Sequence, residues 1–204
     1  MERGSLRDFY ISELKTSHDA ETQLVSALPA MIGAVSADEL RRALECDLEQ
    51  TKDHATGLEM MLDAAGEEAQ GNKGAPLKEQ TQAKKCAGME ALIAELQVLP
   101  EAGLSPDILD LALIAYAQRI EHYEIAMYGT LRDYANALGD SDTALQLQST
   151  LEEEQNADRQ LTSIGQAITA RVASREIANE KIQPSFAEET RTIETRTAKI
   201  KPAA

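Results

Sequence analysis

The sequence predicts an all-α protein whose helices form an antiparallel bundle with carboxylates on its inward face. Three observations lead to this prediction. The 204 residues include only 11 Gly and 6 Pro, and strand-type runs of Val, Ile, Thr and aromatic residues are missing. Four long segments instead repeat their apolar residues at intervals of three and four, as amphipathic helices do. Glutamates stand within three of these apolar stripes.

The first helix is predicted over about residues 5–34. Ser5 is placed to cap it, and Asp8 in the first turn complements the helix dipole. Its inward stripe consists of Tyr10, Leu14, Ser17, Glu21, Leu24, Leu28 and Met31.

A second helix of similar length follows directly. Ser36 and Glu39 predict a capping box at its start. Its stripe consists of Leu40, Leu44, Asp47, Thr51, His54, Leu58, Met61 and Ala65. Because the connection is very short, the two helices are expected to run antiparallel as a hairpin.

A long crossover separates this hairpin from the next. Residues 66–78 are rich in Gly and polar groups and predict a loop, and a shorter helix is expected over about 79–98. The whole crossover, 66–105, is of the kind that some four-helix bundles place between their two hairpins.

The second hairpin begins at Ser105, with Pro106 at the first helical position. The stripe of its first helix consists of Leu111, Ile114, Gln118, Glu121, Ile125 and Tyr128. Gly139 ends that helix, and the next one is predicted to reach about residue 173. The stripe of this last helix consists of Leu147, Leu151, Glu154, Asp158, Leu161, Gly165 and Ile168.

Apolar periodicity weakens after this point, so residues 1–173 are predicted to form the bundle and 174–204 a C-terminal extension. The extension is expected to be a partly helical arm or a disordered segment. We favour an arm that becomes ordered against a partner subunit.

Composition excludes several classes of function. The net charge is −15, and residues 1–170 hold 13 Lys and Arg against 30 Asp and Glu, so the body should repel nucleic-acid phosphates. A signal peptide and a membrane-length apolar run are both missing, and no membrane association is expected. Cys46 and Cys86 lack metal-type spacing and favour a reducing compartment. The expected location is cytoplasmic.

The inward acids indicate a metal site. Burying an unpaired carboxylate is costly, yet Glu21, Glu121, Glu154 and Asp158 stand on stripes that should face the core. Several carboxylates at one level repel one another unless protons or a cation neutralise them. Two iron or manganese ions are the expected solution in an oxygen-rich bundle. The alternative is that chance placed these acids near the stripes, paired with Arg or turned outward.

The second helix gives the weakest signal. Glu49 lies 28 residues after Glu21, much as Glu154 lies 33 after Glu121, which predicts one acid from each helix of each hairpin. Glu49 is nevertheless one position away from its stripe. His54 on that stripe is open to three interpretations: a metal ligand, a core histidine with its own partners, or an exposed residue.

These segments resemble the YciF-like bacterial stress proteins, a ferritin-like group, over roughly residues 5–170. The most specific stretch is 118–131, Gln-Arg-Ile-Glu-His-Tyr-Glu-Ile-Ala-Met-Tyr-Gly-Thr-Leu. The resemblance implies a ferritin-like four-helix bundle with an extra crossover helix between the two hairpins. It also implies a homodimer, kinship with rubrerythrin-type di-iron proteins and a role in stress responses.

The resemblance also implies a ligand set. Its four principal acids become Glu21, Glu49, Glu121 and Glu154, and Glu121-x-x-Glu124 resembles the Glu-x-x-Glu of rubrerythrin-like sites. The chain departs from the Glu-x-x-His pattern of related bundles, because Lys52 and Ala157 stand where His is expected and Asp158 is one place further on. A site poor in nitrogen ligands, or an empty one, is therefore an alternative.

Three functions remain open at this level. The first is a di-metal protein acting as an oxidase or peroxidase on O₂ or peroxide. The second is iron handling without turnover. The third is a non-catalytic stress or interaction protein whose acids are structural, so the sequence leaves open whether the protein is an enzyme.

Overall fold

A computed structural model describes the backbone of residues 4–71 and 85–198, and the side chains of 4–65 and 85–179. Within these residues every regular element is helical, which confirms the predicted all-α class. The elements are α1 (Leu6–Ala34), α2 (Asp38–Gly71), α3 (Ala87–Gln97), the 3₁₀ turn η2 (Leu99–Glu101), α4 (Pro106–Leu138) and α5 (Ser141–Ala198). The chain divides into two compact units, Met1–Gly165 and Gln166–Ala204.

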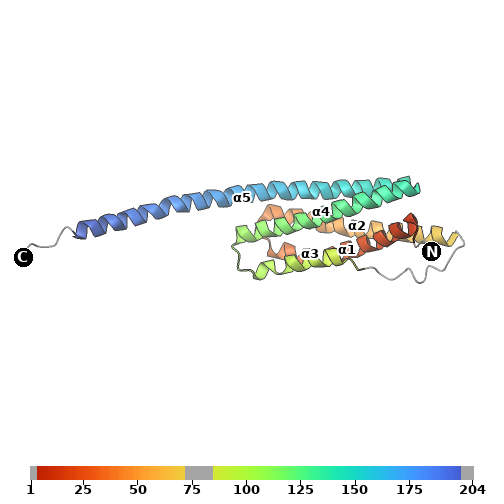
Figure 1. Cartoon of the computed structure of the whole chain (residues 1–204), viewed down its shortest axis with the longest axis horizontal. Coiled ribbons are helices and arrows are strands. Elements are labelled where there is room, and N and C mark those ends of the chain that lie inside the picture. The colour runs from red at the N-terminus through yellow and green to blue at the C-terminus, as the bar shows by residue number, and fades with distance from the viewer. Residues whose placement is uncertain (1–3, 72–84, 199–204) are drawn as a thin grey trace, which may run out of the picture. The chain divides into compact units, whose positions relative to one another are not determined.

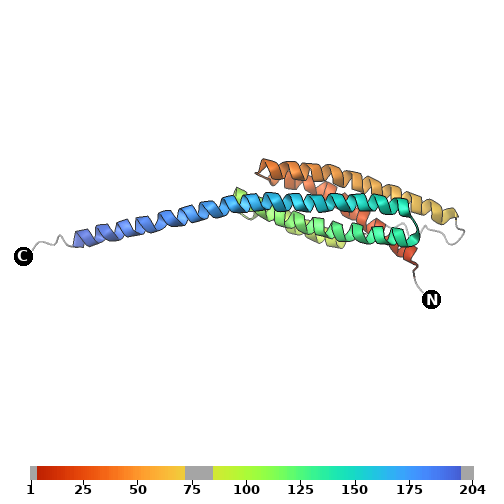
Figure 2. The ribbon, with the colours of Figure 1, turned by 90° about the horizontal axis from the view of Figure 1, so that it is seen from above.

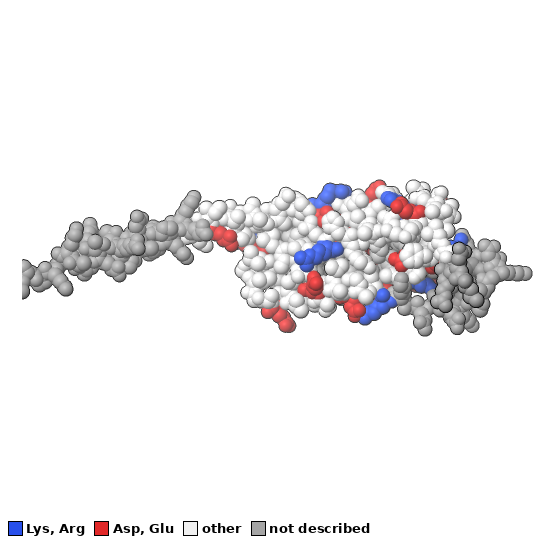
Figure 3. All heavy atoms as spheres, viewed as in Figure 1, with Lys and Arg blue, Asp and Glu red and all other residues white. Residues whose placement is uncertain are grey.

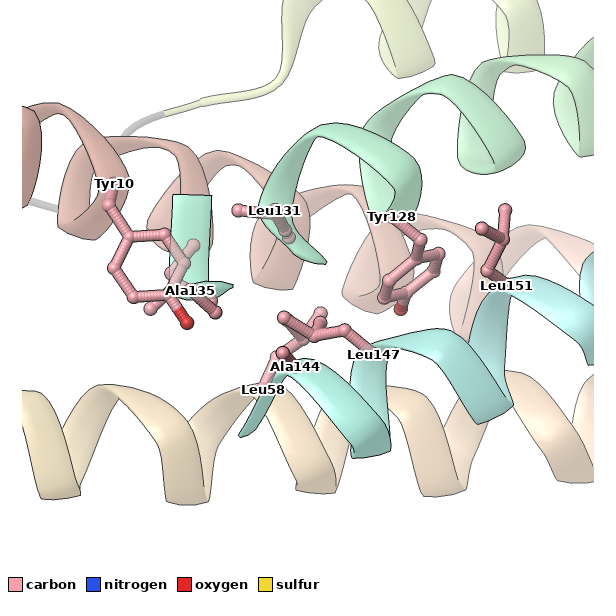
Figure 4. Close-up of a cluster of buried hydrophobic side chains, with 9 residues drawn as sticks. Tyr10, Leu58, Tyr128, Leu131, Ala135, Ala144, Leu147 and Leu151 are labelled. Carbon is pink, nitrogen blue, oxygen red and sulfur yellow. The ribbon is translucent and has the colours of Figure 1, made fainter. Parts of the chain in front are cut away.

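The first unit is the four-helix bundle. Figure 1 and Figure 2 show α1, α2, α4 and the first part of α5 side by side, with α3 against α1 and α4. Apolar side chains from all four long helices meet in one layer (Figure 4). This layer consists of Tyr10, Leu14, Leu58, Tyr128, Leu131, Ala135, Ala144, Leu147 and Leu151. The antiparallel bundle with a crossover helix is therefore confirmed.

Two of the predicted helix ends are built as expected. The Ser5 hydroxyl accepts a hydrogen bond from the Asp8 backbone N–H at 3.1 Å, and the Asp8 carboxylate accepts one from the Ser5 N–H at 3.0 Å. Gly139 ends α4 with a φ of 82°, a left-handed conformation that glycine adopts without steric cost.

The predicted capping box of Ser36 with Glu39 is replaced by a long-range cap. The carboxylate of Asp110, from α4, accepts the Ser36 hydroxyl at 2.6 Å and the backbone N–H groups of Ser36 and Ala37 at 2.9 Å each. Asp110 is 0% exposed. The Asp110 carboxylate satisfies backbone N–H groups at the start of α2 and is itself stabilised by the positive end of the helix dipole. The Ser36 hydroxyl therefore donates to Asp110.

The crossover helix is held to α1 at its start. The Asp19 carboxylate accepts the Cys86 backbone N–H at 2.7 Å, and the Gln23 side chain donates to the Cys86 carbonyl at 3.2 Å. The described part of the predicted 79–98 helix begins at Ala87; residues 72–84 of the crossover lie outside the described residues.

The last helix is longer than the predicted end near residue 173. α5 continues to Ala198, so the described part of the predicted extension is helical, and 199–204 lie outside the described residues. Among the described helices, none is long and apolar enough to cross a membrane. On the face drawn in Figure 3, acidic and basic side chains are interspersed.

Candidate metal centre

Six polar side chains converge in the bundle from all four long helices. They are Glu21 of α1, Asp47 and His54 of α2, Glu121 and Glu124 of α4, and Glu154 of α5. The four glutamates are at most 3% exposed and His54 is 8% exposed. Each belongs to an inward stripe of its helix, because residues three, four or seven positions apart share one face.

The first half of the cluster consists of Glu21, His54 and Glu154. One ligand atom from each lies within 4.8 Å of the others. His54 Nδ1 is 2.9 Å from Glu154 Oε1, and the Tyr128 hydroxyl donates to Glu21 Oε1 at 2.5 Å. His54 Nε2 is 2.8 Å from Glu153 Oε2, so both ring nitrogens have carboxylate partners. This half is well supplied with protein partners.

The second half consists of Asp47, Glu121 and Glu154. Their oxygens also come within 4.8 Å of one another. Glu154 thus belongs to both halves and lies between them. Ligand atoms sit about 2.0–2.6 Å from a bound divalent metal, so each group can surround one ion after small side-chain rotations.

Burial and mutual repulsion keep protons on these carboxyl groups. Burial, and then the charge of Glu154, raise the pKa of Glu21 to about 8 and that of Asp47 to about 7. Burial and the charges of Asp47 and Glu154 raise the pKa of Glu121 to about 11. The pKa of Glu124 is raised well above its usual value by burial and by Glu21. Without a cation, the carboxyl groups therefore retain protons, which reduces the negative charge of the cluster.

His54 is the positive member of the metal-free cluster. Burial alone would lower its pKa, but the neighbouring Glu154 carboxylate, 2.9 Å from Nδ1, together with Glu153, outweighs this effect and raises the pKa to about 9. Burial and the neighbouring Glu21 raise the pKa of the Tyr128 hydroxyl well above its ordinary value, so Tyr128 remains a donor.

Among the described side chains, three buried carboxylate oxygens lack a hydrogen-bond partner: Glu21 Oε2, Glu121 Oε2 and Glu154 Oε1. Glu154 Oε1 does lie 2.9 Å from His54 Nδ1, an ion-pair distance without hydrogen-bond geometry. Buried polar atoms are rarely left unsatisfied. One orphaned oxygen on each of three converging acids suits a divalent cation, so the residues present fit a metal centre.

The structure brings together most of the predicted ligands but not Glu49. The Glu49 side chain is 72% exposed and pairs with Lys52 at 2.6 Å on the surface. Two residues correspond to about 200° of helical rotation, so the stripe that carries Asp47 and His54 turns Glu49 outward. Asp47 takes the place expected of Glu49. Lys52 is 45% exposed and paired with Glu49.

Asp158 lies beside the cluster rather than within either half. It accepts a hydrogen bond from Gln118 at 2.9 Å and is 3.6 Å from His122, whose side chain is 68% exposed. Glu124 is buried among the acids, although it belongs to neither group of three. Tyr128, predicted as core packing, also supplies the hydroxyl that binds Glu21. Its position on the stripe, seven residues after Glu121, places it on the same face of the helix and was the sequence feature that could have indicated this role.

Comparison with known proteins places the chain in a family. A family model described as a domain of unknown function, DUF892, matches residues 5–174. The chain belongs to this family. Protein YciF of Escherichia coli strain K12 is 36% identical over 164 residues, which cover 80% of this chain and 92% of that protein.

Solved structures agree with this assignment. The crystal structure of the E. coli stress protein YciF has a TM-score of 0.71 and 32% identity, and the match covers 81% of this chain and 98% of that one. A structure of YcfI from Rhodopseudomonas palustris has a TM-score of 0.65 and 30% identity, over 79% of this chain and 97% of that one. The resemblance to YciF-like stress proteins predicted from the sequence is confirmed.

Proposed function

We propose that this DUF892 member is a stress-response protein with a carboxylate-rich di-metal centre. The proposal rests on Glu154, which is shared by two groups of ligands that are all buried except for the half-buried Asp47, with an orphaned oxygen on three of the acids. Glu21, His54 and Glu154 would hold one ion, and Asp47, Glu121 and Glu154 the other. Glu124 lies ready beside them as a further carboxylate.

The donor set favours iron or manganese. Carboxylate oxygens with an imidazole suit these metals, whereas softer metals favour thiolates, and neither cysteine belongs to the ligand groups. A bound pair of such ions would supply redox chemistry on O₂ or peroxide, of the oxidase or peroxidase type.

The protein's own contribution is the orientation of the ligands. Glu153 holds the outer nitrogen of His54, which fixes the ring, as partners of metal-binding histidines do. The Tyr128 hydroxyl fixes one oxygen of Glu21 and leaves the other free to bind.

Metal stoichiometry tests the proposal. Purified chain is incubated with Fe(II) without oxygen, or with Mn(II), then dialysed and measured by elemental analysis. We expect two equivalents in the wild type and in Glu49→Gln, which removes an exposed acid from the same helix. We expect neither ion to be retained in Glu154→Gln. Absence of retained metal in the wild type would overturn the proposal.

A non-catalytic cluster is the second candidate. The ion pair of His54 with Glu154 and the hydrogen bond of Tyr128 to Glu21 satisfy part of the cluster without metal. On this alternative the acids are structural or only handle iron. The wild type would then retain no metal, or would retain iron without consuming O₂ or peroxide in an electrode or absorbance assay.

We further propose that the protein is a cytoplasmic homodimer in which the C-terminal helix contacts the partner subunit. Light scattering of the full chain checks the dimer. A closed cage of many subunits would instead favour iron storage.

A further inference from the structure

A pocket of about 150 Å³ leads from the surface between α2 and α5 to the second half of the cluster. Asp47 and Glu121 line it, and Glu153 is a third carboxylate in its wall. Gln50 adds an amide, and the thiol of Cys46 is exposed beside it. The pocket therefore joins solvent to carboxylates that otherwise belong to the interior.

We infer that this pocket is the uptake route through which a hydrated divalent cation reaches the Asp47, Glu121 and Glu154 group. The inference rests on the proposed di-metal function. It adds a direction: cations arrive at the Glu121 side of the cluster and not at the Glu21 side.

The orphaned oxygen of Glu121 is the main reason for this assignment. Glu121 is 2% exposed, its Oε2 has no hydrogen-bond partner, and its side chain forms part of the pocket wall. A buried carboxylate oxygen without a partner is a ligand position for a hard cation. Glu21 also has an oxygen without a partner, but it is 0% exposed, its Oε1 is bound by Tyr128 and it does not line the pocket.

Size and charge agree with a cation. A water molecule occupies about 30 Å³ in the liquid, so the pocket has room for roughly five, or for an ion with part of its hydration shell. The pocket lining holds three acidic residues and no Lys or Arg, so it favours a cation over an anion, and an arriving ion displaces the proton that metal-free Glu121 retains.

Glu153 links the pocket to the other half. Its carboxylate lines the pocket, and its Oε2 is 2.8 Å from His54 Nε2. An ion that enters therefore meets a carboxylate that also holds the single histidine of the ligand groups. Glu153 therefore contributes both to the uptake route and to the orientation of His54.

Cys46 allows the route to be closed in the otherwise unaltered protein. The sequence has two cysteines, and Cys86 is buried, so Cys46 is the thiol that a reagent reaches first. Alkylation with N-ethylmaleimide would place a bulky group at the pocket. The rate of Co(II) uptake, followed by visible absorption in stopped flow, is then compared with the final stoichiometry.

We expect alkylation to slow uptake roughly tenfold or more and to leave the final stoichiometry at two equivalents. Cys46→Ala treated with the same reagent should load at the untreated rate. The positional control is Ser26→Cys in the Cys46→Ala background, which carries the alkyl group on an exposed position of α1 and should also load normally.

A charge pair at Gln50 tests the route without any reagent. Gln50→Lys should slow Co(II) uptake roughly tenfold at low salt and Gln50→Glu should speed it, because a single rim charge acts on the association rate. Ser26→Lys controls for net charge and should change little.

The outcomes separate the two proposals. Equal uptake rates for alkylated, Gln50→Lys and unmodified protein, with two ions bound at the end, overturn the route and leave the di-metal function standing. Failure of the unmodified protein to bind Co(II), Fe(II) or Mn(II) overturns the function and the route together.

Discussion

The two halves of the acidic cluster share Glu154 but are built differently. On the Glu21 side, the Tyr128 hydroxyl donates to Glu21 Oε1 at 2.5 Å and both nitrogens of the His54 ring lie within 2.9 Å of carboxylates, although Glu21 Oε2 has no hydrogen-bond partner. On the Glu121 side, Glu121 Oε2 also has no hydrogen-bond partner, but the ligand group contains carboxylates alone, and Asp47 and Glu121 line a pocket.

This difference indicates how a helical bundle can keep a buried acidic site stable. The protein supplies a hydroxyl and an imidazole on one side, where they fix the carboxylates, and on the other side it leaves the acids beside a pocket through which a cation can reach them. An unmet carboxylate in the core destabilises the fold until a cation or a proton reaches it. If the two sides have these separate roles, substitutions on one side should leave the other side's ion in place.

Removal of His54 should have the largest effect on the metal-free protein. His54→Ala leaves the buried Glu154 without its cation, and breaking a buried pair costs about 3–5 kcal/mol. We expect the free energy of unfolding at pH 7 to fall by that amount in urea denaturation. His122→Ala, at a 68% exposed site, is the control and should change it by less than about 0.5 kcal/mol. Equal losses in both variants would contradict a structural role for the Glu21 side.

Loss of the shared carboxylate should affect both ions, whereas loss of a side-specific one should affect one. Glu154→Gln is expected to weaken binding of both metal ions by at least roughly 100-fold, since even outer partners of ligands contribute 10- to 100-fold. Glu121→Gln should retain about one equivalent, at the Glu21 side. Isothermal titration calorimetry measures both. Retention of two equivalents in Glu121→Gln would show that the halves are not separate ligand groups.

Most of the fold could be predicted from the sequence, because helix periodicity and local caps are short-range properties. The stripes placed Leu14, Leu58 and Leu147 in the core, where they are at most 1% exposed. The start of α2 was not predictable in the same way. Its cap, Asp110, comes from 74 residues away, and no local pattern marks that pairing.

The candidate site could be predicted where the stripe and the resemblance agreed. Both indicated Glu21, Glu121 and Glu154, and the structure groups all three with ligand partners. They disagreed on α2, where the resemblance indicated Glu49, which is one position off the stripe; Asp47 stood on the stripe but was not predicted as a ligand. The structure follows the stripe, because helical rotation and not motif spacing decides which side chain reaches the interior. Hydroxyl partners such as Tyr128 depend on packing between helices and leave only a weak trace in the sequence.

Stability of the metal-free protein should fall as the pH rises from about 5 to 9. Glu21, Asp47 and Glu121 have native pKa values of about 8, 7 and 11, above their ordinary ones, so the native state keeps protons that the unfolded chain releases. His54, with a native pKa of about 9, acts in the same direction: its contribution is complete below pH 6.5 and is lost as pH rises through 9.

Glu121→Gln tests this pH dependence on the Glu121 side of the cluster. It should flatten the slope and raise the free energy of unfolding at pH 8 by roughly 1–3 kcal/mol, while Glu49→Gln leaves the wild-type slope. Urea denaturation at a series of pH values in the presence of a chelator gives the measurement. A wild-type stability that rises between pH 5 and 8 would contradict the proton-holding cluster.

The smallest expected effect comes from a substitution on the Glu21 side of the cluster. Tyr128→Phe keeps the ring in the core but removes the hydroxyl that donates to Glu21, and a hydrogen bond to a charged or partly charged group contributes about 1.5–3 kcal/mol. Because native Glu21 retains its proton up to a pKa of about 8, the loss at pH 7 should lie at the lower end of that range.

Urea denaturation measures that loss, and metal titration shows where it acts. Both oxygens of Glu21 are then without a hydrogen-bond partner, but the Glu121 side is unaltered. The variant should therefore bind its first ion on the Glu121 side with unchanged affinity. The second ion should bind more weakly, because Glu21 is no longer held in place. If Tyr128→Phe weakened the first ion as well, the hydroxyl would support the whole cluster and the distinction between the two sides would not hold.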